Sequence, residues 1–84
     1  MISIFALSEI QGEEMDKILA WAQAGGVVAE HYFVDINEDS KALAKLSGFE
    51  VFPVIFKIDS LTAELTKFAE GTEAILALDA STVR

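Results

Sequence analysis

Residues 48–59 read GFEVFPVIFKID and contain Pro53, the only proline of the chain. Proline has no backbone N–H and is normally excluded from the interior of a paired strand. The residues on either side, Val51-Phe52 and Val54-Ile55-Phe56, nevertheless form as β-prone a run as the sequence contains. We therefore expect a strand over residues 51–59 in which Pro53 has a special structural role.

The residues before this stretch alternate between strand and helix patterns. Residues 1–7 are a short apolar run, typical of a strand buried on both faces. Residues 8–26 repeat apolar side chains at helical spacing and end at a glycine pair, which predicts an amphipathic helix. The β-prone residues 27–36 predict a second strand, and residues 37–40 (NEDS) supply cap residues for a short helix over residues 41–48.

For several side chains of these first elements, the sequence predicts a specific role. Ser8 and Gln11 have the spacing of a capping box, so Ser8 is expected to cap the first helix rather than to act in catalysis. Trp21 flanks the apolar stripe, either as a packing residue at the core edge or as an exposed contact residue. His31 is expected to be a packed or surface histidine without a catalytic role. The stripe expected to face the core consists of Met15, Ile18, Leu19 and Ala22.

The residues after the proline stretch predict a hairpin and a last helix. Residues 60–63 (SLTA) favour a turn and residues 64–70 a fourth strand, so the last two strands form an antiparallel pair. Gly71 or Thr72 then caps a helix over residues 73–80. The side chains of this helix available for the core are Ile75, Leu76 and Leu78.

The order of these elements, β-α-β-α-β-β-α, predicts the α/β class. A right-handed β-α-β crossover makes the first two strands parallel, whereas the closing hairpin is antiparallel. One mixed four-stranded sheet with helices on both faces accommodates this order. No linker or change in composition divides the chain, so residues 1–84 are expected to form a single domain.

The charge and composition exclude several classes of function. Fourteen acidic residues against six basic ones give a net charge of −8. The lysines are also scattered, so we expect no direct contact with a nucleic-acid backbone. The chain has no cysteine and one histidine, which excludes disulfides, thiolate nucleophiles and cysteine–zinc sites. We therefore expect no metal, no cofactor and no catalytic residue.

The apolar segments do not resemble targeting or membrane-spanning sequences. Residues 18–29 are too short to span a bilayer and are interrupted by Gln23 and a glycine pair. Residues 1–10 lack a basic region and run directly into a strand pattern, unlike a signal peptide. We expect a soluble, cytoplasmic protein that does not contact membranes.

Three segments, taken together and in order, resemble the thioredoxin fold and most closely a small glutaredoxin. They are VDINED (residues 34–39), LSGFEVFPVIF (residues 46–56) and AEGTEAILAL (residues 69–78). The resemblance implies a thioredoxin-like (glutaredoxin-like) fold in which a cis Phe52–Pro53 bond begins the third strand. It also implies that the N–H and C=O of Phe52 are free to receive an extended thiol or peptide substrate. The residues alone leave open a trans Pro53 at a bulge or an edge strand.

The resemblance fails at the redox motif. Glutaredoxins carry C-x-x-C, or one cysteine, at the start of the first helix. The matching positions here are Glu9 and Gly12 or, after a shift of one residue, Ile10 and Glu13. Because neither pair supplies a thiol, disulfide exchange is excluded and we expect no enzymatic activity.

The glutathione-binding apparatus of that family is matched only in part. The turn at residues 71–73 could hold the peptide-like end of a tripeptide, but the usual basic residue before the cysteine motif is absent. Glu9, Glu13 and Glu14 instead make the rim acidic, which repels an anionic ligand.

We therefore hypothesise a redox-inactive module that binds a protein partner through the former active-site face. The small size and the divergence also suit a viral or mobile-element accessory protein that inhibits a host factor. The alternatives are noncovalent binding of glutathione or a related peptide at the cis-proline loop, and an acidic nucleic-acid mimic that blocks a basic partner. The partner's identity and the oligomeric state stay open. The candidate partner-binding residues are Ile10, Trp21, Phe52, Pro53, Glu9, Glu13 and Thr72.

Overall fold

The computed structural model describes all residues from Met1 to Arg84. Its elements are β1 (Ile2–Ala6), α1 (Ser8–Ala24), β2 (Ala29–Phe33), α2 (Glu38–Leu46), β3 (Val54–Ile58), β4 (Leu65–Glu70), α3 (Thr72–Leu76) and a 3₁₀ turn, η1 (Ala80–Thr82). The predicted α/β class and the predicted order of elements are confirmed. No helix combines the length and the apolar composition needed to cross a bilayer.

The four strands form one mixed sheet in the order β2-β1-β3-β4. β1 is parallel to β2, with Ile2 opposite Ala29, and antiparallel to β3, with Phe5 opposite Val54. β3 and β4 form an antiparallel hairpin with an irregularity after Ile55. Both predicted pairings, the parallel pair and the hairpin, are therefore confirmed. β1 and β3 are the inner strands, and β2 and β4 are the edges.

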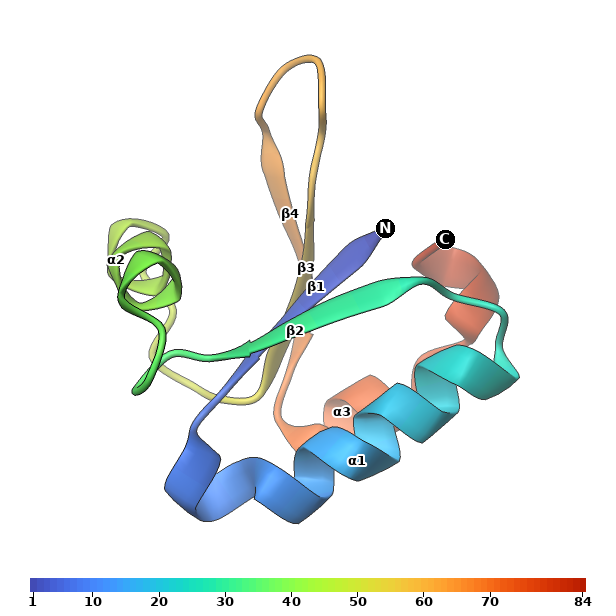
Figure 1. Ribbon diagram of the computed structural model, residues 1–84. Helices are drawn as coiled ribbons and strands as arrows, with labels where there is room; N and C mark the ends of the chain where they lie inside the picture. The colour runs from blue at the N-terminus through green and yellow to red at the C-terminus, as the bar shows by residue number, and fades with distance from the viewer.

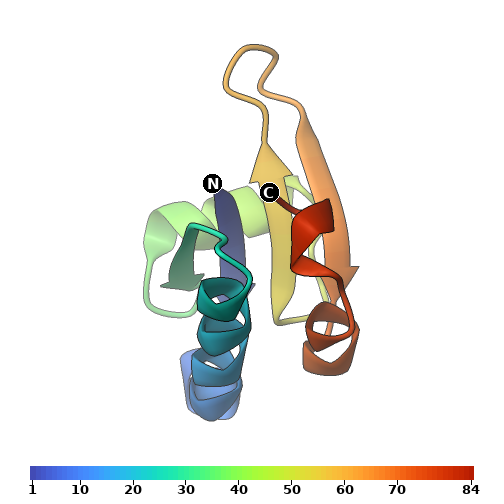
Figure 2. The same cartoon turned by 90° about the vertical axis from the view of Figure 1, so that its right-hand side faces the viewer.

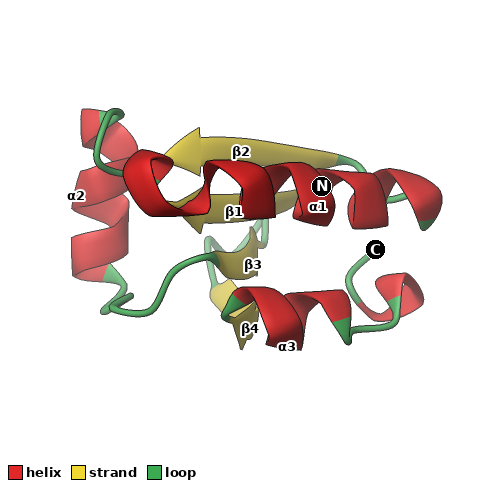
Figure 3. Cartoon of the chain, turned by 90° about the horizontal axis from the view of Figure 1, so that it is seen from below, coloured by secondary structure: helices red, strands yellow, loops and turns green.

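Helices cover both faces of the sheet, and each face has its own core. Figures 1 and 3 show α1 and α3 on one face and α2 on the other. Successive side chains of a strand point to opposite faces, so the inner strands contribute to both cores. The core beneath α1 and α3 contains Ile2, Ile4, Ala6, Met15, Ile18, Ala22, Val27, Ile55, Ile75 and Val83. The core beneath α2 contains Phe5, Val34, Ala44, Val54 and Phe56.

Helix α1 buries the stripe predicted for it. Met15, Ile18 and Ala22 are buried in the larger core, and Leu19 packs half-buried against it. The helix ends close to η1: a Cβ atom at Gly25 would collide with the Cβ of Ala80 in η1. Glycine at this position therefore allows the end of α1 to approach the C-terminal turn.

The C-terminal region differs from the single helix predicted over residues 73–80. α3 ends at Leu76, and Asp79 caps the separate turn η1 through its carboxylate. The prediction that Leu76 faces the core is wrong, because it is 37% exposed. Neighbouring residues point about 100° apart on an α-helix, and Ile75 occupies the position that faces the core. Val83, beyond α3, completes that core.

Pro53 lies directly before β3, so this strand begins at Val54 and not at residue 51. The Phe52–Pro53 bond is cis, as the resemblance implies, and the trans alternative is wrong. Pro53 is buried, and its C=O accepts a hydrogen bond from the N–H of Gly71 at 2.7 Å. This bond ties the start of β3 to the residue that follows β4.

The β3–β4 hairpin extends beyond the ends of the other strands, as Figures 1 and 2 show. Asp59 holds its turn, because its Oδ1 accepts the N–H of Thr62 (2.9 Å) and of Leu61 (2.8 Å). The same bonds hold the pKa of Asp59 below its usual value. Leu61, at the tip, is 94% exposed.

Candidate functional site

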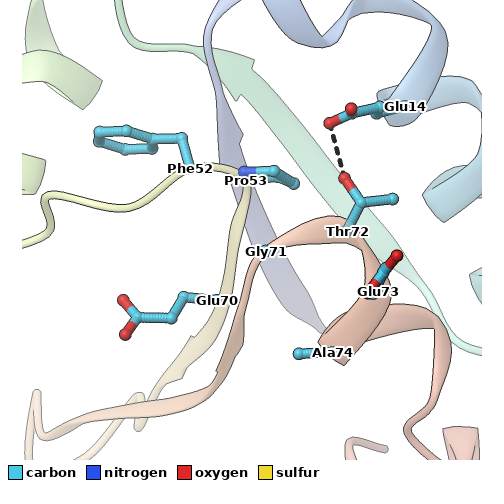
Figure 4. Close-up of a pocket in the computed structure, with 8 residues that line it drawn as sticks. All are labelled: Glu14, Phe52, Pro53, Glu70, Gly71, Thr72, Glu73 and Ala74. Carbon is cyan, nitrogen blue, oxygen red and sulfur yellow. Dashed lines mark hydrogen bonds between the residues drawn. The ribbon is translucent and has the colours of Figure 1, made fainter.

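The candidate site lies where the Phe52–Pro53 loop meets the first turns of α1 and the start of α3 (Figure 4). A hollow of about 520 Å³ opens between these segments. We call it the acidic hollow because its charged lining side chains are all glutamates. It is lined by Glu14, Phe52, Pro53, Glu70, Gly71, Thr72, Glu73 and Ala74.

Contacts between distant segments hold the acidic hollow in shape. Thr72 Oγ1 donates a 2.6 Å hydrogen bond to Glu14 Oε2, which links α3 to α1 (Figure 4). Gly71 precedes α3 with a φ of 91°, a region that favours glycine. Glu70 pairs with Lys67 at 3.4 Å. Because this is the one ion pair in the structure, the hollow keeps a net negative charge and repels anions.

Phe52 separates this hollow from the opposite side of the molecule. Its N–H donates no backbone hydrogen bond, and neither do the N–H groups of residues 50–51. Its C=O, by contrast, accepts a hydrogen bond from Nε2 of Gln11. The expectation that both groups are free is therefore wrong for the C=O. The ring points away from Thr72 and Glu14 (Figure 4) and packs against the core beneath α2.

Gln11 is a functional candidate that the sequence did not single out. Its side chain is buried, with Oε1 accepting the N–H of Leu7 (2.9 Å) and Nε2 donating to the C=O of Phe52. Its φ and ψ of −120° and 22° interrupt the helical geometry of α1. The amide therefore joins the start of α1 to the proline loop. Its spacing to Ser8 was the only sequence signal, and that spacing suggested a capping box instead.

Ser8 does not have the capping role predicted for it. Leu7 is the residue that precedes α1, and no side chain caps the helix there. Ser8 instead donates from Oγ (2.6 Å) and from its N–H (3.0 Å) to the carboxylate of Asp35, which follows β2. A carboxylate can accept two such bonds at once, and this pairing replaces the local cap. Both hydrogen bonds lower the pKa of Asp35, and the bond from the Ser8 hydroxyl has the larger effect.

The Ser8–Asp35 link predicts a pH-dependent contribution to stability. Because the folded-state pKa is lowered, the contribution is complete above the unfolded pKa of about 3.9 and is lost as pH falls through the folded value. We expect Asp35→Asn to lower the urea midpoint near neutral pH, and the difference from wild type to shrink as pH falls towards about 2. Asp16→Asn, at an exposed position on α1, is the control. A difference for Asp35→Asn that stays constant down to that pH would contradict the link.

A second hollow lies on the α2 side of Phe52. It measures about 370 Å³ and has a mainly apolar floor with two lysines and one aspartate in its lining. We call it the lysine-rimmed hollow. Phe52 lines both hollows, so its backbone and ring lie between two cavities of opposite character. The residues that line the second hollow are Leu7, Val34, Asp35, Lys41, Ala44, Lys45, Phe49 and Phe52.

The structure brings three of the seven predicted site residues together in one hollow. Phe52, Pro53 and Thr72 all line the acidic hollow. Ile10, which is 73% exposed, lies in the first turns of α1 with the exposed Glu9 and Glu13.

Trp21 is not part of this group. It lies eleven positions after Ile10 on α1, about 16 Å along the helix axis at 1.5 Å per residue. Its ring is half-buried against the larger core, and Nε1 donates to the C=O of Leu78 at 3.1 Å. Of the two roles left open for Trp21, the structure therefore shows packing at the core edge. His31 is exposed on β2 and lines neither hollow.

The sequence predicted an acidic rim that includes Glu14 and a turn that includes Glu73, but it did not place Glu70 or the two lysines at the site. Glu14, Glu70 and Glu73 meet in the acidic hollow from three separate elements, and the two lysines of the other hollow come from α2. No group of three or more histidine, aspartate or glutamate side chains is arranged to hold a metal ion. The two hollows thus offer hydrogen-bond donors, apolar surface and charge, which suit binding. Comparisons with protein-family models, curated protein sequences and solved structures return no match for this chain.

Proposed function

We propose that this protein is a redox-inactive, thioredoxin-like module that binds an extended segment of a partner protein at the surface around Phe52. The observation that carries the proposal is the unpaired backbone N–H of Phe52, which lies between two hollows. The strand order β2-β1-β3-β4, with one parallel and two antiparallel pairings, supports the thioredoxin-like assignment.

Backbone donors at a surface favour the addition of an extended peptide. The N–H groups of residues 50–52 form a short run without backbone partners. Such a run can pair with a peptide as a strand edge does, while pockets on either side select its side chains. The C=O of Phe52 already accepts a hydrogen bond from Gln11. The backbone N–H is therefore the group of Phe52 that can bind the peptide.

Exposed apolar side chains in the same segments support a protein partner. Ile10 is 73% exposed and Val51 is 48% exposed, and each lies within a few residues of a hollow-lining residue. Glu9 and Glu13 surround Ile10 with charge. An apolar contact within a polar rim is the usual anatomy of a protein interface.

The same contacts make catalysis and glutathione binding weaker explanations. The chain has no thiol, and the Ser8 hydroxyl donates to the carboxylate of Asp35, whose lowered pKa makes it a weak general base for a serine hydroxyl. Three glutamates line the hollow next to Thr72, and they disfavour a tripeptide that carries its own carboxylates.

Selection of peptides from a displayed random library tests this proposal. We expect peptides enriched on the wild-type protein to bind Phe52→Ala and Ile10→Glu about tenfold or more weakly, because truncation of a central contact commonly costs at least about 1.4 kcal/mol. Titrated ¹⁵N-labelled protein should show shifts in the amide signals of residues 50–52.

Leu61→Ser provides the matched control, since Leu61 is an exposed apolar side chain at the distant hairpin tip. Peptide affinity should be unchanged in this variant. Enriched peptides that bind Phe52→Ala and Ile10→Glu as tightly as the wild-type protein would overturn the proposed binding surface.

A further inference from the structure

The lysine-rimmed hollow has the size and lining of a pocket for one side chain. Its volume of about 370 Å³ is near the lower end of the range of about 300–1,000 Å³ for ligand pockets. Phe52 is one of its lining residues, and the N–H groups of residues 50–52 donate no backbone hydrogen bond. The apolar floor consists of Leu7, Val34, Ala44, Phe49 and Phe52.

The charges around this hollow favour an anionic group beside the apolar one. Lys41 and Lys45 are one turn apart on α2, so they lie on the same side of the helix. They are two of only six basic residues in a chain of net charge −8. Neither is in an ion pair, because the one ion pair of the structure joins Lys67 to Glu70.

The third charged residue of the lining, Asp35, forms no ion pair with either lysine. Both carboxylate oxygens of Asp35 accept hydrogen bonds from Ser8, at 3.0 Å and 2.6 Å. The ammonium groups of Lys41 and Lys45 are thus available to an incoming carboxylate, and the lining carries a net charge of +1.

We propose that this hollow receives the C-terminal residue of the partner, with its apolar side chain on the floor and its terminal carboxylate between Lys41 and Lys45. Only at the end of a chain does one residue carry both an apolar side chain and a backbone carboxylate. The preceding residues then lie against the unpaired N–H groups of residues 50–52. The inference rests on the proposed function and specifies which segment of the partner is bound.

Three small probes test the chemistry by titration of ¹⁵N-labelled protein. They are N-acetyl-Gly-Gly-Phe with a free carboxylate, the same peptide as its carboxamide, and 3-phenylpropionate. We expect the free acid to shift the amides of Val34, Ala44, Phe49 and Phe52 and to bind about tenfold more tightly than either other probe, because charge-assisted bonds exceed neutral ones. Raising the salt to about 0.5 M should reduce this advantage.

Charge-matched variants show whether the two lysines are responsible. Lys41→Gln/Lys45→Gln should abolish the preference for the free acid over the carboxamide. Lys17→Gln/Lys57→Gln, which changes the net charge equally outside both hollows, should preserve it. The stability of both double variants is compared with that of the wild-type protein by urea denaturation, so that a folding defect is recognised.

The outcomes separate this inference from the proposed function. Equal binding of acid and carboxamide, or shifts outside the hollow, would overturn the inference, and equally tight binding of 3-phenylpropionate would assign the hollow to small carboxylates. If selected peptides depend on Phe52 but not on the two lysines, the proposed function stands and the inference is wrong. If the free acid binds the hollow but no Phe52-dependent peptide is selected, the proposed function is the part that fails.

Discussion

Phe56→Ala is expected to lower the free energy of unfolding by about 3–5 kcal/mol, the usual range for removing a buried aromatic ring. Phe56 is 1% exposed and is the largest of the fully buried side chains. Its ring lies 4.7 Å from that of Phe5 and 5.2 Å from that of Phe49, measured between centroids. The core beneath α2 has only five buried residues, so few neighbours can move in to fill the cavity.

The consequence is large because small domains have stabilities of only about 5–15 kcal/mol. Urea denaturation followed by circular dichroism measures the change, with the slope of the transition as a check on two-state behaviour. Leu61→Ala removes an apolar side chain of similar chemistry that is 94% exposed, and it should change stability by less than about 0.5 kcal/mol. Similar effects of the two substitutions would contradict the described core.

Gln11→Ala is expected to lower stability by about 2–3 kcal/mol and to alter the site directly. The substitution leaves the N–H of Leu7 and the C=O of Phe52 without their side-chain partner. A buried polar group without a partner costs about 1–3 kcal/mol, and because these two groups are only partly buried, each is expected to contribute near the lower end of that range. The free C=O of Phe52 would then be available to a peptide, so the variant tests both folding and recognition.

Two measurements distinguish the loss of the two Gln11 side-chain hydrogen bonds from a general packing defect. Hydrogen exchange at the amide of Leu7 should accelerate more than exchange at inner-strand amides, because only the first group loses its acceptor. Gln23→Ala, at an exposed position of the same helix, should leave stability within about 0.5 kcal/mol of wild type. Unchanged exchange at Leu7 in Gln11→Ala would show that the amide does not hold this turn.

The part of the site that was predictable from sequence is the part encoded locally. Pro53 within a β-prone run marked the loop, and Gly71-Thr72 before a helical pattern marked the opposite wall of the acidic hollow. Ile10 was identified because it occupies the place of a lost cysteine within the resemblance. These features depend on residue type and on short spacing, which the sequence displays directly.

The residues whose contacts the sequence did not predict are those whose partners lie far along the chain. Ser8 had a plausible local role as a cap, but Asp35, twenty-seven positions later, binds its hydroxyl. Gln11 bonds Phe52 across forty-one positions. Trp21 fits the periodicity of α1 as an edge residue, yet only the position of Leu78 shows that its indole is engaged. Local propensity does not specify which of several polar partners a side chain meets.

The sequence by itself determined the α/β class, the order of the elements, the two strand pairings and the lack of thiol chemistry. Hydrophobic period, turn residues and composition carry this information because each acts over a few residues. The tertiary structure alone decided that Phe52 lies between two hollows, that Gln11 occupies its C=O, and that the glutamates and lysines separate to opposite sides of it. These arrangements arise when the sheet brings α1, α2 and α3 around one loop, and no local pattern encodes such distances.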